Sequence, residues 1–400
     1  MSKKKTIKIF LIIFFVLFYS IKSQAEDIND NFSINVDASI GTFLNQEGII
    51  EDNESKRIEN SWGFNLYNSR ISFISKIDDD FILLKVMTRV TPKFEFMDGF
   101  VQFNFTDYFR LYIGQFKIPS VYELTNIGAT TIDFIARSVM TRNIANWSLS
   151  KTPYDSPFNE NDLIYRDTGI GFKGELFDKR INYFFMIGTG FGGNKFLNSP
   201  QVKKGDISVN NLGNGFYGAR LEFYPWDNFI RIGGHYNLNY HKNVYLTEDK
   251  KNPINFFRQS YSTEIAFILP YETNLGNFSI PIGLRLNFVY AGGKVEDHIL
   301  SDKKNPVDYI YNGYEISSIF EILKECLEFG IKFENYSDSK YDINKKTNND
   351  SSQNYLTIGS TYFVNKNLKC QLNYVYNINS SFDNPGYKGN TLYSVVIFKF

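Results

Sequence analysis

Basic side chains recur at alternate positions in several segments whose intervening residues are apolar. Successive side chains of a strand point to opposite faces, so such a segment presents its cations on one face only. Rings of Arg and Lys that face water attract anions, and the planar Arg fork suits phosphate or carboxylate because it donates two parallel hydrogen bonds. The basic residues that we expect to contact anions are Arg70, Lys85, Arg89, Arg110, Lys117, Arg137, Arg142, Arg220, Arg231 and Arg285.

Two interpretations of these cations stay open at this point. In one, Arg89, Arg110, Lys117, Arg137 and Arg142 form a basic patch at a narrow point of a water-filled passage. In the other, the cations pair with nearby acids and hold a loop against a wall. The same faces carry more basic residues, Lys76, Lys173, Lys332 and Lys369, and the acidic residues Asp37, Glu175, Glu222, Glu264, Glu315, Glu328 and Glu334.

Other chemistry-bearing patterns are weak. The three histidines, His235, His241 and His298, have no metal-ligand spacing, and the chain has no nucleophile elbow, phosphate-cradling Gly loop or zinc motif. We therefore expect no cofactor, no metal site and no enzymatic activity. Cys326 and Cys370 fall on non-adjacent predicted strands with opposite facing, so we expect two free thiols.

The N-terminal 25 residues have the pattern of a cleaved secretory signal. A Lys-rich start precedes an apolar run from Ile9 to Tyr19, which is too short to span a bilayer as a helix, and Ser23 and Ala25 supply small residues at the cleavage site. An uncleaved anchor is the alternative. Cleavage would remove five of the 43 basic residues and none of the 43 acidic ones. The predicted mature chain, 26–400, is therefore net acidic, which argues against a nucleic-acid partner.

Alternation with period two dominates the rest of the chain, and aromatic residues make up 17% of it, as β-structure favours. Each alternating segment is close to the length that a tilted strand needs to cross a bilayer. We predict sixteen strands near 33–43, 66–77, 81–91, 97–105, 108–117, 166–175, 181–191, 214–224, 229–241, 257–269, 277–290, 310–322, 326–336, 354–363, 368–377 and 391–400.

The predicted connections alternate between short turns and long polar stretches. Outer-membrane barrels show this alternation, with short periplasmic turns and long external loops. In hydrocarbon every backbone group needs a partner within the protein, so the sheet must close. We predict an all-β, transmembrane, antiparallel up-and-down barrel of about 16 strands. The short links are 78–80, 106–107, 225–228 and 364–367, and the long ones are 44–65, 191–213, 242–256, 291–309, 337–353 and 378–390.

The chain ends in an amphipathic strand whose last residue is Phe400. This looks like the signal that bacterial outer-membrane proteins present to their barrel-assembly machinery, which we expect as a partner together with outer-membrane lipid. Aromatic residues near predicted strand ends are expected to form interfacial girdles. They are Tyr112, Tyr224, Trp226, Tyr290, Tyr311 and Tyr336.

Several motifs resemble the phosphate-selective porin O and P family. They are Leu111-Tyr112-Ile113-Gly114-Gln115-Phe116-Lys117-Ile118-Pro119, then Glu123-Leu124-Thr125, then Phe134-Ile135-Ala136-Arg137-Ser138, and Arg166-Asp167-Thr168-Gly169. The resemblance implies a trimeric barrel with a long third loop, here 118–165, folded into the lumen as a constriction. An external loop over a neighbouring subunit is the alternative. The family's constriction Lys falls near Glu123 and its Ser pair near Asn126 and Ile127, so the resemblance does not carry the ion preference.

The expected function is passive diffusion of small hydrophilic solutes through an outer-membrane porin, with a preference for phosphate or other small anions as the finer expectation. One alternative is a surface or adhesin barrel whose external loops bind a host or phage. Another is an outer-membrane enzyme, which needs a Ser–His pair on the barrel wall. A third is a secreted soluble β-sandwich.

Overall fold

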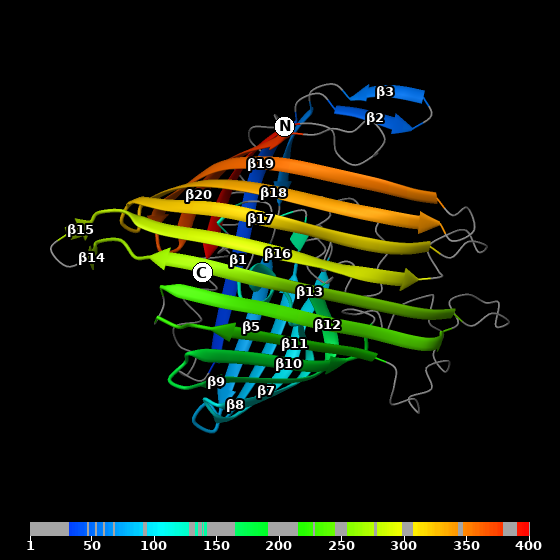
Figure 1. Ribbon diagram of the computed structural model, residues 1–400. Coiled ribbons are helices and arrows are strands. Elements are labelled where there is room, and N and C mark those ends of the chain that lie inside the picture. The colour runs from blue at the N-terminus through cyan, green and yellow to red at the C-terminus, as the bar shows by residue number, and fades with distance from the viewer. Residues whose placement is uncertain are drawn as a thin grey trace, which may run out of the picture.

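The computed structural model describes most of the chain after the predicted signal segment (Figure 1). The predicted signal peptide, Arg137, Arg142 and Phe400 lie outside the described residues. The described ranges are 32–45, 48–52, 54–58, 61–66, 69–90, 94–127, 133–134, 138, 140–141, 165–190, 215–226, 229–244, 254–275, 278–297, 307–342, 347–378 and 390–399.

One antiparallel sheet closes on itself. Strand β1 (Phe32–Asn45) pairs on one edge with the last strand, β21 (Thr391–Lys399). On its other edge it pairs with β4 (Ser61–Leu66) and β5 (Arg70–Ile77), which lie end to end along it. The described chain places 17 strands in this sheet, and β4 and β5 share one position, so the ring has sixteen positions. The predicted closed up-and-down barrel is confirmed.

The other strands follow the chain around the ring, each paired with the next. They are β6 (Ile82–Arg89), β7 (Glu95–Thr106), β8 (Phe109–Lys117), β9 (Arg166–Leu176), β10 (Ile181–Gly188), β11 (Gly215–Phe223), β12 (Ile230–Val244), β13 (Ile254–Leu269), β16 (Gly283–Asp297), β17 (Val307–Leu323), β18 (Leu327–Asp342), β19 (Thr347–Asn365) and β20 (Leu368–Asn377).

Two small hairpins stand apart from the barrel wall, β2 (Gly48–Asp52) with β3 (Glu54–Ile58) and β14 (Thr273–Leu275) with β15 (Phe278–Ile280) (Figure 1). A one-turn helix, α2 (Tyr122–Thr125), follows β8. Within the described ranges, no helix is long and apolar enough to cross a membrane.

Several predicted boundaries were wrong. Strands β16 to β19 run through much of the stretches 291–309 and 337–353 that we predicted as loops, and the predicted loop 44–65 contains a hairpin and β4. The predicted strand 277–290 is broken, since β15 pairs with β14 and β16 begins at Gly283. The physical reason is that backbone pairing needs no apolar side chains, so polar strands can continue past the alternating band.

The two faces of the barrel have opposite character. In β18, Ile331 points outward and is 40% exposed, whereas the next residue, Lys332, points inward and is 4% exposed. In β12, Ile232 and Tyr236 are exposed while Arg231 is buried inside. The apolar set therefore faces out and the polar set faces in, which is the reverse of a soluble protein.

Four of the predicted girdle residues point into the barrel instead, among them Tyr224, whose hydroxyl donates to the inward Glu222. Tyr112, Tyr311 and Tyr336 are buried, and the Tyr311 hydroxyl donates to the Gln259 carbonyl at 3.3 Å. Each of these three is an even number of residues away from inward-facing polar residues of its own strand, so it must face inward too. This alternation determines the face more directly than nearness to a strand end does. Trp226 is exposed, as a girdle residue would be.

Candidate functional site in the barrel interior

The chain between β8 and β9 packs against inward-facing side chains wherever it is described. We call the described residues between 118 and 141 the strap, namely 118–127, 133–134, 138 and 140–141. Its root is fixed by the Ile118 N–H, which donates to the Tyr165 carbonyl at 2.7 Å. Below this root, the Gln115 amide on β8 donates to the Met97 carbonyl on β7 at 2.6 Å. Ile118, Val121 and Leu124 are buried and form part of an apolar cluster with side chains of the wall.

Polar groups on β11, β12 and β13 hold the first residues of the strap. Arg220 Nη1 donates to the Ser120 carbonyl at 2.6 Å, and Asn237 Nδ2 donates to the Pro119 carbonyl at 2.7 Å. The Tyr122 N–H donates to Glu264 at 3.0 Å. These bonds satisfy backbone groups of the strap that would otherwise be buried without partners.

Charges around α2 are closely packed. Arg220 pairs with Glu264 at 2.6 Å and with Glu222 at 2.8 Å. The Arg231 guanidinium lies 3.3 Å from the centre of the Tyr122 ring, a cation–π arrangement. The Asn126 amide donates to Glu222 at 2.7 Å.

A second set of contacts lies on another part of the wall. Asp133 pairs with Arg285 of β16 at 3.0 Å, and Arg285 also pairs with Glu328 of β18 at 2.8 Å. The Gln371 amide on β20 donates to the Asp133 carbonyl at 3.2 Å. The buried Phe134 ring lies under Lys332, whose Nζ is 5.2 Å from the ring centre. The strap is therefore held by at least six strands of the wall, among them β11 to β13, β16, β18 and β20.

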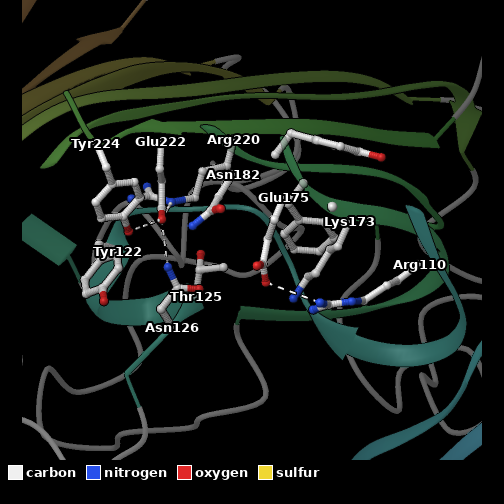
Figure 2. A pocket seen from close by; sticks show the side chains of 13 residues that line it. Arg110, Tyr122, Thr125, Asn126, Lys173, Glu175, Asn182, Arg220, Glu222 and Tyr224 are labelled. Carbon is white, nitrogen blue, oxygen red and sulfur yellow. Dashed lines mark hydrogen bonds and ion pairs between the residues drawn. The ribbon is translucent and has the colours of Figure 1, made fainter. Parts of the chain in front are cut away.

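A cavity of about 270 Å³ lies between α2 and the wall formed by β8 to β11 (Figure 2). It lies near the short turns, because Arg110 begins β8 and Glu175 is close to the end of β9. Figure 2 shows Lys173 and Arg110 on one side of this cavity and Tyr224, Glu222 and Tyr122 on the other. The lining residues are Arg110, Tyr122, Thr125, Asn126, Lys173, Gly174, Glu175, Asn182, Tyr183, Phe184, Arg220, Glu222 and Tyr224.

The two cations of the cavity differ in their partners. Arg110 lies 3.3 Å from Glu175 and 3.3 Å from Asp107. Lys173 instead lies over aromatic rings, with its Nζ 4.2 Å from the Phe184 ring centre and 5.0 Å from that of Tyr112. Among the described residues no carboxylate lies within ion-pair distance of Lys173. Aromatic ring faces are thus the described partners of its ammonium group.

Tyr224 closes the other side of the cavity, just past the end of β11. Its hydroxyl donates to Glu222 at 2.9 Å. Burial, together with the adjacent Glu222 carboxylate, raises the pKa of Tyr224 above its ordinary value, so the hydroxyl stays neutral and keeps donating.

Most of the predicted anion-contacting residues that the structure describes have protein partners. Lys85 lies 3.5 Å from Asp98, Arg89 pairs with Glu95, and the Lys117 ammonium donates to the Ile127 carbonyl at 3.0 Å. Arg70 is buried on the inward face of β5. Arg220 and Arg285 bind the strap, as does Lys117, whereas Lys85 and Arg89 pair with acids of the adjacent strand β7. Anion contact by the ten predicted residues stays a prediction.

Sequence reasoning placed Lys173 inside the barrel but left it out of the anion-contacting set. The signal that could have singled it out is its neighbourhood of aromatic inward positions on adjacent strands. The motif residues turn out to be structural. Arg166 pairs with Asp98 of β7, and Asp167 accepts from the Thr189 hydroxyl and the Gly190 N–H, each at 2.6 Å. The two cysteines are free thiols, as predicted.

Comparison with solved structures identifies the fold. An anion-selective porin from Comamonas acidovorans superposes with a TM-score of 0.59 at 12% identity, over 92% of this chain and 99% of that one. The fold is that of the porins. OmpF of Salmonella typhi, solved with daunomycin, gives 0.58 at 13% identity over 93% and 99%. The outer-membrane channel DcaP of Acinetobacter baumannii gives 0.56 at 10% identity over 92% and 97%.

The sequence comparisons give no relative. No protein-family model matches the chain, and no curated protein sequence matches it. At identities this low, the porin-like structures show a shared architecture and nothing about the solute.

Proposed function

We propose that this chain is an outer-membrane porin through which small hydrophilic solutes diffuse passively. The observation that carries the proposal is a closed sixteen-position barrel with apolar side chains outside and charged side chains inside. The apolar outer face suits lipid, and closure satisfies the backbone hydrogen bonds that lipid cannot. A barrel of this size is wide enough to keep an aqueous interior. The porin-like solved structures support the same conclusion.

The connection 118–165 is the proposed constriction of this pore. Its described residues contact inward-facing side chains of β11, β12, β13, β16 and β20. A segment held there removes cross-section from the passage. The motifs that resemble the phosphate-selective O and P family lie at both roots of this connection, and they support a distant membership of that family. Export through a cleaved signal and assembly as a homotrimer complete the proposal.

The finer proposal is a preference for small anions, contributed mainly by Lys173 with Arg110. Lys173 combines a position on the cavity wall with a charge that no described carboxylate neutralises. Arg110 shares its charge with Glu175 and Asp107 but keeps donors for a solute, because a guanidinium has five N–H groups. A phosphate or carboxylate that enters this cavity could contact both Lys173 and Arg110.

Planar-bilayer recording of the purified chain tests both levels of the proposal. Stepwise conductance increases on insertion support a pore, and reversal potentials under a salt gradient give the sign of the preferred ion. A clear cation preference would remove the anion proposal while leaving the porin intact. Folded protein that inserts without conducting would favour the surface or adhesin barrel instead.

A further inference from the structure

Four glycines on the inward face of the barrel lie directly under apolar side chains of the strap. Gly330 and Gly359 are opposite each other on β18 and β19 and lie under the Phe134 ring. The other two, Gly218 on β11 and Gly313 on β17, lie under Pro119 and Met140. All three strap side chains are buried.

The fit between these glycines and the strap is tight. A Cβ added at Gly330 would lie 2.9 Å from the Phe134 ring, and one at Gly359 would lie 3.3 Å from it. A Cβ at Gly218 would lie 2.7 Å from Pro119 Cγ, and one at Gly313 would lie 3.1 Å from Met140 Cγ. An added Cβ would also meet wall atoms, namely Ile319 Cδ1 at Gly330, Asn373 Nδ2 at Gly359, Asn237 Oδ1 at Gly218 and the Asn335 backbone carbonyl at Gly313. Any other residue at these four positions would therefore crowd both the strap and the wall. At Gly330 the wall atom is the end of a flexible side chain, so the Phe134 ring is the main obstacle there.

Glycine destabilises the interior of a strand, so its presence there needs a physical explanation. It weakens the strand, and it often marks a place where another part of the chain approaches closely. The four strand glycines have ordinary backbone angles, since the described glycines with positive φ are Gly114, Gly190 and Gly215. Conformational freedom therefore does not explain them, whereas close approach does, by the strap together with neighbouring groups of the wall.

We propose that Gly218, Gly313, Gly330 and Gly359 are seats that fix the strap against the wall and thereby set the width of the passage. The inference rests on the proposed porin function. Polar bonds at Asp133 and Ser120 orient the strap, and the seats set its depth. Gly330 and Gly359 are the specific pair, because one ring fills the space left by two missing side chains on paired residues.

A double-mutant cycle tests the seat under Phe134. Gly330→Ala pushes the ring off the wall, so single-channel conductance falls by roughly 1.5-fold, since a strap displaced inward narrows the pore. Phe134→Ala empties the seat, and Gly330→Ala made in that background changes conductance much less, because the added methyl then meets only the flexible end of the Ile319 side chain. Gly283→Ala is the matched control. It is also an inward glycine, but its added methyl would meet Glu321 and the Tyr271 backbone and no residue of the strap.

Thiol labelling provides a readout that needs no conductance. In protein with Cys326→Ser and Cys370→Ser, a reporter Met140→Cys is expected to react slowly with a water-soluble maleimide, and Gly330→Ala is expected to speed this reaction. Heat-modifiable electrophoretic mobility confirms that each variant is folded. The seat proposal would be overturned if Gly330→Ala changed conductance equally in wild type and in Phe134→Ala. It would also be overturned if Gly330→Ala left the labelling rate unchanged. If the wild-type chain forms no channels but Gly330→Ala still speeds labelling of the reporter, the porin proposal is overturned and the seat proposal stands.

Discussion

Arg220 on β11 donates to both carboxylate oxygens of Glu264 on β13, at 2.6 Å and 3.2 Å, across the strand that lies between them. The same two side chains bind the strap, because Arg220 donates to the Ser120 carbonyl and Glu264 accepts from the Tyr122 N–H. The two residues are 2% and 1% exposed. One buried ion pair thus joins the barrel wall to the root of the segment that we propose as the constriction.

Glu264→Ala is expected to loosen this root. Glu264→Ala removes one of the two carboxylates that pair with the buried Arg220 and leaves Glu222 as its partner, so we expect a loss of about 3 kcal/mol of folding free energy, the low end for a broken buried pair. The expected results are a lower urea midpoint in lipid vesicles and a noisier open channel. Glu264→Gln is the matched control, because it keeps the volume and one acceptor for the Tyr122 N–H. An open-channel noise in the Ala variant equal to wild type would show that this pair does not position the strap.

Lys173→Met is expected to weaken the anion preference, because it removes the charge on the cavity wall and keeps a long apolar side chain over the Phe184 ring. The reversal potential under a salt gradient should move toward the potassium potential. Lys179→Met is the control. Lys179 lies at the same end of the barrel but is 76% exposed in the turn, where screening weakens its effect. Equal shifts from the two variants would assign the effect to overall charge and remove the role of Lys173.

The fold was predictable from sequence because successive side chains of a strand point alternately to lipid and to the interior. The outward Ile331 beside the inward Lys332 can be placed without any structure. The partners of the inward residues could not be predicted, because they depend on register and strand tilt around the ring. Arg220 and Glu264 are 44 positions apart, and Asp133 and Gln371 are 238 apart. The polar extensions of β18 and β19 were missed because they carry no alternation to detect.

The Asp98–Arg166 pair links β7 to the start of β9, and both side chains are buried. Asp98→Leu is expected to destabilise the barrel by about 3–5 kcal/mol, because Arg166 and Lys85 lose the carboxylate that they share. Combining it with Arg166→Met should restore part of that loss, since apolar side chains of similar volume can replace a buried pair, while the partly exposed Lys85 still lacks Asp98. Urea unfolding followed by tryptophan fluorescence measures both. A double variant as unstable as the single one would show that the pair contributes packing geometry and not charge compensation.

Ile331→Arg tests whether the outer face contacts lipid. An Arg on the lipid face of a barrel near the bilayer midplane costs about 2–4 kcal/mol. The variant should fold into vesicles with a lower yield and a lower urea midpoint than wild type. Ile331→Leu controls for the change of residue and should match wild type. Wild-type stability in the Arg variant would mean that this face is not in hydrocarbon.

The central claim is that a continuous water path crosses the barrel from end to end. Swelling of liposomes that contain the purified mature chain, in isotonic solutions of uncharged sugars of increasing size, measures this path without reference to charge. A continuous water path would give fast swelling with small sugars, slower swelling as sugar size increases, and a sharp cut-off set by the strap. Vesicles with folded, inserted protein that swell no faster than protein-free vesicles with any sugar would contradict it.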